Sequence, residues 1–434
     1  MKKRLLAALM AGAMALTMTA CGGSSSGSDD SNAASGSDSG SAGSYKVGIV
    51  QLVQHEALDA ATQGFKDALT EKLGDKVKFD EQNASGDSAN CSTIVNGFLS
   101  ENADFAKACE DAGISFIGPP SDILAMMGDK LSAKQIAIKA GVPIIPGSTE
   151  PLKDGDDALE KAISFGFPII LKAAAGGGGR GMRRCDTPEE VKPAFELVRS
   201  EAQKAFGNDD IFIEKFLVEP KHIEVQVLAD KYGNCYHIGE RDCSLQRRYQ
   251  KVVEFAPAWS VNPEIIANIR NDAVKIAKSV GYINAGTLEF LVDKSGSYYF
   301  IEMNPRIQVE HTVTEMVTGI DLVRAQILIA EGYPLSHPAI GLNSQDDVHV
   351  RGYAIQCRVT TEDPTNNFAP DNGKITSYRT GGGNGVRLDG GNATTGTVIS
   401  PYYDSLLVKV TCWDNSFQGT CRKALRAISE VRVR

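Results

Sequence analysis

The chain lacks any paired-cysteine motif. Its nine cysteines are scattered singly and none forms a Cys-x-x-Cys pair, which disfavours zinc ribbons and thioredoxin-like sites. It also lacks an excess of positive charge, because 54 acidic residues outnumber 45 Lys and Arg residues and give a net charge of −9. We therefore expect no nucleic-acid partner. An unpatterned set of thiols is typical of a reduced, cytosolic enzyme.

Long apolar runs are absent after the first twenty residues. Residues 2–4 are basic, and the apolar run 5–16 is too short to span a bilayer. The letters MTAC, which end at Cys21, resemble a bacterial lipobox. We therefore expect a signal peptide over 1–21 and a membrane lipoprotein acylated on Cys21, followed by a flexible Gly/Ser-rich linker over 22–44. This export signal conflicts with the cytosolic location that the thiols indicate.

Residues 45–96 have the pattern of a β-α-β unit. YKVGIVQLV predicts a buried strand, HEALDAATQGFKDALTEKLG an amphipathic helix, and VKFDEQN a second strand. The segment resembles the opening unit of a substrate-binding lipoprotein of an ABC importer. A different pattern begins near residue 97, so we infer a junction there. Two origins stay open, a genuine gene fusion and two reading frames joined by error.

A glycine run, KAAAGGGGRGM, follows an apolar strand. It contains G-x-G-x-x-G, but a strand-like stretch, 182–185, comes next and the helix signal starts only at 186–190. A Rossmann loop opens directly into a helix, and no GK[ST] follows, so we exclude a Rossmann loop and a P-loop. The run therefore joins two strands. Without Cβ atoms, its amides can close over an anion as a lid, and Lys172 is placed to meet a phosphate.

The stretch 286–304 predicts a β-hairpin, since two alternating runs flank Ser295-Gly296. A two-residue turn there pairs residues whose numbers sum to 591, so Glu289 faces Glu302. Two opposed carboxylates repel by roughly 0.2–1 kcal/mol, and this favours a divalent cation between them. Asn304 projects from the same face and adds an oxygen ligand. Hard oxygen ligands near phosphate indicate Mg²⁺ or Mn²⁺, although a salt-bridged surface ladder remains an alternative.

Two further polar stretches are candidates for the reaction centre. Residues 240–251 place many charges among apolar side chains, which suggests a lined cleft more than a solvated face. Arg306, Gln308 and Glu310 alternate with apolar residues, so we expect them to share one side of an extended segment. A guanidinium beside a carboxylate can hold a small oxyanion and accept its proton. An ordinary Arg306–Glu310 ion pair is the alternative.

Six motifs occur in order along the rest of the chain: GDKLSAK, KAAAGGGGRGM, EKF-x-x-x-P-K-HIEVQVLAD, ERDCS-x-QRRYQK, EMNPRIQVEHTVTE and YAIQCRVTTEDP. Together they resemble the biotin carboxylase family of the ATP-grasp superfamily, from about residue 97 to 434. FAPAWSV, GYINAGTLEFLVD and NNFAPDNGKI resemble the pyruvate carboxylases in particular. The resemblance implies that ATP phosphorylates bicarbonate to carboxyphosphate, and that CO₂ from it carboxylates N1′ of biotin.

The resemblance also implies roles for individual residues. It assigns nucleotide binding to Lys130, Lys172, the lid glycines Gly177, Gly178, Gly179 and Gly181, and Glu214, Lys215, Leu217, His222 and Gln246. Metal binding falls on Glu289, Glu302 and Asn304. Bicarbonate binding falls on Lys251, Arg306, Gln308 and Val309. Glu310 matches the base that deprotonates bicarbonate, and Arg358 matches the cation that stabilises the biotin enolate.

We therefore expect an α/β and α+β fold, in which an ATP-grasp core precedes a truncated β-rich biotin carboxylase C-terminal domain and follows a partial β-α-β fragment. The domains expected are a signal peptide (1–21), a linker (22–44), a substrate-binding-protein-like unit (45–96), a remnant of the biotin carboxylase N-terminal domain (97–129), the ATP-grasp domain (130–330) and the C-terminal domain (345–434). The family implies a homodimer and a biotinyl carrier domain encoded elsewhere, since no AMKM-type biotinylation motif is present.

Three alternatives to this function stay open. The same catalytic motifs occur in biotin carboxylase subunits of acyl-CoA carboxylases. A membrane-tethered solute-binding lipoprotein is supported by residues 1–96 alone, and the fifty residues after the linker are too few for a two-lobed cleft. A chimera lacking much of its N-terminal domain would expose an apolar face and be inactive.

Overall fold

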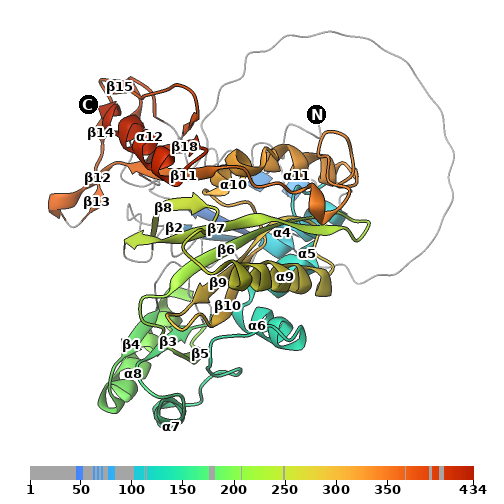
Figure 1. The fold of residues 1–434 in the computed structure, drawn as a ribbon. Helices are drawn as coiled ribbons and strands as arrows, with labels where there is room; N and C mark the ends of the chain where they lie inside the picture. The colour runs from blue at the N-terminus through green and yellow to red at the C-terminus, as the bar shows by residue number, and fades with distance from the viewer. Residues whose placement is uncertain are drawn as a thin grey trace. The chain divides into compact units, whose positions relative to one another are not determined.

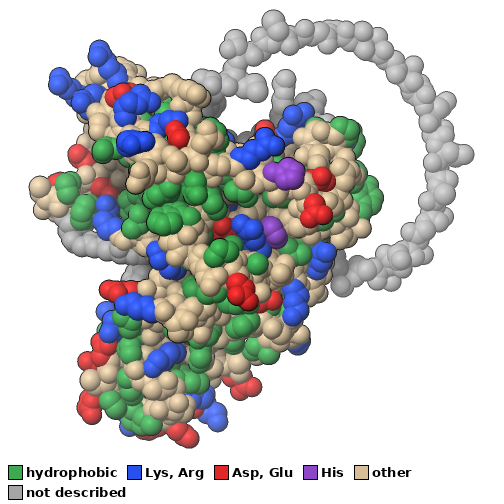
Figure 2. All heavy atoms as spheres, viewed as in Figure 1, with side chains coloured by type: hydrophobic (Ala, Val, Ile, Leu, Met, Phe, Trp, Pro, Cys, Tyr) green, Lys and Arg blue, Asp and Glu red, His purple; other side chains and the backbone are tan. Residues whose placement is uncertain are grey.

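The structure is a computed structural model that describes residues 45–51, 62–63, 66–67, 70–71, 77–83, 102–111, 113, 115–174, 181–206, 208–247, 250–366, 368–390, 393–399 and 405–434. The expected signal peptide, linker and junction at 97 lie outside these residues. No helix among the described residues is long and apolar enough to cross a membrane. Acidic and basic side chains are interspersed over most of the visible face (Figure 2).

An eight-stranded antiparallel sheet is the largest element of the fold (Figure 1). Its strands, in spatial order, are β10 (Tyr298–Asn304), β9 (Asn284–Val292), β6 (Lys221–Ala229), β7 (Cys235–Arg247), β8 (Gln250–Ala256), β11 (Tyr353–Thr360), β18 (Leu406–Asp414) and β16 (Val386–Gly390). The order differs from the order in the chain. Strand β6 lies between β7 and β9, so residues about sixty positions apart become direct neighbours.

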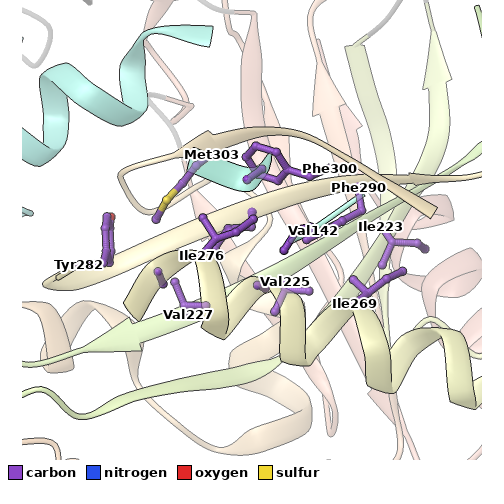
Figure 3. Packing of buried hydrophobic residues seen from close by; sticks show 14 of the residues in the cluster. Val142, Ile223, Val225, Val227, Ile269, Ile276, Tyr282, Phe290, Phe300 and Met303 are labelled. Carbon is purple, nitrogen blue, oxygen red and sulfur yellow. The ribbon is translucent and has the colours of Figure 1, made fainter. Parts of the chain in front are cut away.

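Each face of this sheet is covered by helices, as Figure 1 shows. Helix α9 (Pro263–Ser279) packs on one face, where Ile223, Val225 and Phe290 join its apolar side in a buried cluster (Figure 3). Helices α10 (His311–Thr318) and α11 (Leu322–Ala330) cover the other face. Because side chains alternate along a strand, Glu224 and Glu289 point away from the α9 cluster and toward the α10 side.

A smaller sheet carries the glycine run. It has the order β4-β3-β5 and consists of β3 (Ile169–Ala173), β4 (Met182–Cys185) and β5 (Ile211–Lys215). Helices α7 (Gly155–Phe165) and α8 (Pro188–Phe206) complete its buried core. Strands β3 and β4 are antiparallel neighbours, so the prediction that the run joins two strands is confirmed.

The C-terminal part packs helix α12 (Phe417–Ser429) against the β11, β18 and β16 end of the large sheet. Short strands complete it: β12 (Glu362–Asp363), β13 (Ala369–Pro370), β14 (Gly373–Lys374), β15 (Tyr378–Arg379), β17 (Val398–Ile399) and β19 (Arg432–Val433). Two 3₁₀ turns, η4 (Gln345–Asp347) and η5 (Pro364–Asn366), lie between the longer elements. This part is β-rich, as expected.

Among the described residues before position 115, β1 (Tyr45–Gln51) and β2 (Val77–Asn83) form a parallel pair. Helix α4 (Asn102–Asp111) lies beside β1 and packs on α5 (Ser121–Gly128), which leads into α6 (Lys130–Lys139). The expected pair of strands is therefore present, and the mixed α/β fold class is confirmed.

Candidate active site

Lys251 on β8 is the centre of an ionic cluster on the α10 side of the large sheet. Its Nζ contacts Glu224 and lies 3.0 Å from Glu289 Oε1 and 2.9 Å from Glu310 Oε1. Burial disfavours the charged amine, but the three carboxylates outweigh burial and raise the pKa of Lys251. The ammonium is therefore permanent at neutral pH, and three strands and one loop converge on it.

Arg241 on β7 lies beneath this cluster and is fully buried. It pairs with Glu224, its Cα neighbour on β6, at 3.1 Å. Its remaining N–H groups donate to the side-chain oxygens of Gln226 (2.9 Å), Thr287 (3.1 Å), Thr314 (3.1 Å) and Gln308 (3.3 Å). The five-donor fork of arginine suits this arrangement. Arg241 thus connects its own strand β7 to β6, β9, α10 and the loop before α10.

Glu310 lies between two cations. Its Oε1 faces Lys251, and its Oε2 accepts from Arg358 on β11 at 2.9 Å. Arg358 also pairs with Glu254, 2.6 Å away. Burial raises the pKa of Glu254 to about 7, Arg358 opposes that rise, and Glu310 adds to it. Two carboxylates therefore share one guanidinium in a partly water-excluded site, an arrangement suited to holding an oxyanion and accepting its proton.

Arg306 does not have the predicted position. Its guanidinium contacts the Asn304 side chain at 3.5 Å and the Ile307 carbonyl at 3.3 Å, and it is exposed. The cations beside Glu310 are Lys251 and Arg358, so Arg306 is not its partner in this structure, and the role of Arg306 in bicarbonate binding stays a prediction. The reason is local, because the chain turns at 309–310 and does not stay extended. Gln308 and Glu310 still share the buried side.

The hairpin forms with the predicted Glu289–Glu302 pair, but its loop is longer than the predicted two-residue turn. Residues near the turn pair with sums of 590, as Tyr298 does with Val292, because the loop spans Asp293 to Ser297. A bulge between Phe300 and Glu302 then shifts the register by one. Glu302 consequently pairs with Glu289, as expected.

The predicted metal ligands lie together at this bulge. The Asn304 amide donates to Glu289 Oε1 at 2.9 Å, next to the opposed Glu302. Two carboxylates and an amide fit a hard divalent cation. Such an ion would share Glu289 with Lys251 and with His222, whose Nε2 lies 2.9 Å from Glu289 Oε2.

His222 on β6 joins the metal ligands to the predicted nucleotide residues. Burial disfavours the imidazolium, but the nearby carboxylates of Glu224 and Glu289 outweigh burial and raise the pKa of His222 to about 10. The Gln246 amide lies 3.2 Å from His222 Nδ1 and donates to the Cys243 carbonyl. The two residues therefore form one unit, and His222 adds positive charge beside the metal ligands.

A second ionic cluster occupies the smaller sheet. Glu214 on β5 is buried, lies 2.5 Å from Lys172 Nζ on β3, and also pairs with Lys134 of α6. Burial raises the pKa of Glu214, but the two ammonium groups outweigh burial and lower it to about 2. Lys134 Nζ also lies 4.5 Å from the centroid of the Phe212 ring. The two ammonium groups and one carboxylate leave a net positive charge, and Lys172 lies on the strand that precedes the glycine run in the sequence.

The remaining predicted nucleotide residues are placed only in part. Lys215 donates to the carbonyls of Gly166 and Phe167 at 2.8 Å, and Leu217 follows in the loop after β5. Gly181 is buried at the start of β4 with φ of 65°. Gly177, Gly178, Gly179 and the Lys130 side chain lie outside the described residues.

Replacing Lys172 with alanine should weaken ATP and ADP binding about tenfold, because one charged contact to phosphate is lost. Isothermal titration calorimetry measures the dissociation constants. Lys204→Ala, an exposed lysine of α8, is the matched control and should leave both constants unchanged. Equal constants for Lys172→Ala and the unaltered chain would remove Lys172 from the phosphate site.

Glu214→Gln should flatten the pH dependence of stability below pH 4.5. The folded-state pKa of about 2 lies below the ordinary value of 4.5, so the Glu214 contribution is complete above pH 4.5. It is lost as pH falls from 4.5 toward 2. Urea unfolding at pH 7, 4.5 and 3 measures this loss, which should be smaller in Glu214→Gln than in the unaltered chain. An equal loss of unfolding free energy between pH 4.5 and pH 3 in both chains would contradict the ion pairing of Glu214.

Sequence reasoning missed Glu224, Glu254 and Lys134, and it gave Arg241 no role beyond membership of the charged stretch 240–251. One signal was available, since Glu224 and Gln226 alternate with Ile223, Val225 and Val227 within one strand. Polar side chains at every second position of such a strand indicate a buried polar face. Nothing local marks Lys134, which is one lysine among several along α6.

A large antiparallel sheet with an acidic cluster, joined to a small sheet with a glycine run, defines an ATP-grasp type of nucleotide-dependent enzyme. Residues 129–338 match the family model "Carbamoyl-phosphate synthase L chain, ATP binding domain". Residues 356–434 match "Biotin carboxylase C-terminal domain", and residues 83–124 match "Biotin carboxylase, N-terminal domain". The chain belongs to the biotin carboxylase family.

Named relatives agree with this family. The chain is 55% identical over 338 residues, 78% of its length, to the pyruvate carboxylases of Schizosaccharomyces pombe and Bacillus subtilis. It spans 28% and 29% of their lengths, less than a third of each.

Solved structures cover more of the chain. The biotin carboxylase domain dimer of Hydrogenobacter thermophilus 2-oxoglutarate carboxylase, with MgADP, ADP and bicarbonate, is 40% identical with a TM-score of 0.74, over 90% of each chain. Campylobacter jejuni biotin carboxylase with β,γ-ATP is 38% identical with a TM-score of 0.74, over 90% of this chain and 92% of its own. Rhizobium etli pyruvate carboxylase is 39% identical with a TM-score of 0.74, and 38% of its chain is covered.

Proposed function

We propose that this chain catalyses the ATP-dependent carboxylation of biotin by bicarbonate. The observation that carries the proposal is the position of Glu310 between Lys251 and Arg358, 2.9 Å from each. Bicarbonate in this site meets two fixed cations and a carboxylate able to accept its proton. The solved relative that holds MgADP and bicarbonate adds support.

The steps follow from the placement of these residues. Lys251 and Arg358 hold bicarbonate while Glu310 takes its proton. The bicarbonate oxygen then attacks the γ-phosphorus of ATP, the bond to the β-phosphate oxygen breaks, and ADP and carboxyphosphate form. Lys172 on β3 and Lys134 on α6 meet at Glu214, and they can neutralise phosphate charge together with the glycine run that follows β3 in the sequence. Carboxyphosphate breaks down to CO₂ and phosphate, and the released phosphate accepts the N1′ proton of biotin. N1′ of the resulting enolate, which Arg358 stabilises, then bonds to the CO₂.

A divalent cation completes this proposal. Glu289, Glu302 and Asn304 would hold Mg²⁺ or Mn²⁺, which would neutralise charge on the transferred phosphoryl group. We expect the biotin on a separate carrier domain, and we expect the chain to form a homodimer, as the family does. The identity to pyruvate carboxylases favours pyruvate as the final acceptor, with an acyl-CoA as the second candidate.

The location of the chain is a proposal of its own. ATP-dependent carboxylation suits the cytoplasm, whereas the sequence over 1–21 predicts a lipoprotein signal. We propose the cytoplasm for the carboxylase chemistry. Fractionation of cells that express the full chain tests this, and recovery of the chain in the membrane fraction, with a fatty acid on Cys21, would overturn it.

The test of the function is phosphate release from ATP by the purified full chain with Mg²⁺ and free biotin, with and without bicarbonate. Release that depends on bicarbonate, together with acid-labile label from ¹⁴C-bicarbonate on biotin, supports the proposal. Nucleotide binding without such release would favour the inactive chimera. A chain that neither binds nucleotide nor releases phosphate would contradict the proposed ATP site as well.

A further inference from the structure

We propose that Lys409 is a positioning residue for Glu310, which connects the C-terminal part of the chain to the reaction centre. This inference rests on the proposed function. Lys409 lies on β18, where its neighbours across the ladder are Arg358 on β11 and Asp389 on β16. It therefore shares a row of the sheet with Arg358, the cation that faces Glu310.

The Lys409 ammonium contacts the chain on both sides of Glu310. Nζ donates to the carbonyl oxygen of Val309 at 3.1 Å and lies 3.3 Å from His311 Nε2. The Val309 carbonyl belongs to the peptide bond that includes the Glu310 nitrogen. One half-buried cation from a distant strand thus restrains the residue before Glu310 and the residue after it.

The His311 ring is itself held from the opposite side. His311 Nδ1 lies 3.2 Å from Glu315 Oε2, one turn further along α10. Arg387 on β16 lies 2.6 Å from the same Glu315 oxygen, and the other oxygen accepts the Leu322 N–H at 2.8 Å. An Nε2 atom that accepts from the Lys409 ammonium requires the ring proton on Nδ1, which faces Glu315.

Lys409 therefore restrains the backbone next to Glu310, while Lys251 and Arg358 restrain its carboxylate. A general base must lie within hydrogen-bond reach of the proton it accepts, and a displacement of 1 Å can lower a rate about a hundredfold. Removal of the Lys409 ammonium leaves the carboxylate contacts intact but frees the Val309 carbonyl and His311. The expected defect is therefore in bicarbonate positioning and not in nucleotide binding.

Lys409→Met, which removes the ammonium but keeps an unbranched apolar side chain of similar length to the lysine stem, tests this in the full chain. Lys374→Met is the control, because Lys374 is an exposed lysine on β14 in the same part of the fold. We expect Lys409→Met to raise KM for bicarbonate and lower kcat, each about tenfold, with KM for ATP changed less than twofold. The control should match the unaltered chain.

Hydrogen exchange followed by mass spectrometry gives a readout that needs no turnover. Lys409→Met should speed exchange of the amides of residues 306–312 about tenfold, with β9, β10 and α12 unchanged. Unchanged exchange at 306–312, a rise spread over the whole chain, or an equal effect on both KM values would overturn the proposal. If the unaltered chain shows no bicarbonate-dependent turnover, the proposed function fails, while the exchange result still decides the role of Lys409.

Discussion

Glu310→Gln should lower bicarbonate-dependent ATP cleavage by about 10²–10⁴-fold, the usual contribution of a general base. Glutamine keeps the size of the side chain but cannot accept the bicarbonate proton. Lys251 keeps Glu224 and Glu289 as partners, and Arg358 keeps Glu254, so we expect the fold to persist. Steady-state phosphate release with saturating bicarbonate measures the rate.

Nucleotide binding separates this effect from general damage to the site. The dissociation constant for ADP in Glu310→Gln should stay within about twofold of the unaltered chain, because Glu310 contacts neither Lys172 nor Glu214 among its described partners. Glu331→Gln, at the exposed end of α11, serves as the matched control and should retain full activity. Turnover above a tenth of the original rate in Glu310→Gln would rule out Glu310 as the base.

Arg241→Met should destabilise the folded chain by about 3–5 kcal/mol, the usual effect of removing one member of a buried ion pair. The substitution leaves Glu224 with one fewer cation and removes the donor to Gln226, Thr287, Thr314 and Gln308. Unpaired buried acceptors add to the loss. Urea unfolding at pH 7, followed by circular dichroism, measures the free energy of unfolding.

The control for Arg241 is an arginine whose ion pair is exposed. Arg183 pairs with Glu201 at 2.9 Å on the surface of the smaller sheet, and Arg183→Met should change the free energy of unfolding by no more than about 0.5 kcal/mol. A loss below about 1 kcal/mol in Arg241→Met would show that the buried network contributes little to stability. It would then leave alignment of the site as the remaining role of Arg241.

Local pattern was enough for several parts of the fold. The alternating runs around Ser295-Gly296 predict the β9–β10 hairpin, and the strand-like stretch 182–185 excludes a Rossmann loop. Both predictions hold because strand periodicity and helix caps depend on neighbours within a few residues. Even the pairing of Glu289 with Glu302 follows, although a longer turn and a bulge replace the simple two-residue turn.

The composition of the reaction centre could not be read from local pattern. Lys251, Arg358 and Glu310 come from β8, β11 and the start of α10, and they meet because β11 pairs with β8 and α10 covers that face. Strand order in an antiparallel sheet is a long-range property. The family motifs supplied these residues, whereas the local alternation of residues 306–310 pointed only to Arg306 as a cation near Glu310.

The sequence by itself determined the β-hairpin with its opposed carboxylates, the glycine run between two strands and the membership of the biotin carboxylase family. Only the tertiary structure decided which cations neutralise which carboxylates: Arg241 on Glu224, Arg358 on Glu310 and Lys134 on Glu214. The physical reason is that a buried charge is tolerated only next to a partner. Folding brings that partner from a distant part of the chain, and its place in the sequence carries no mark of the contact.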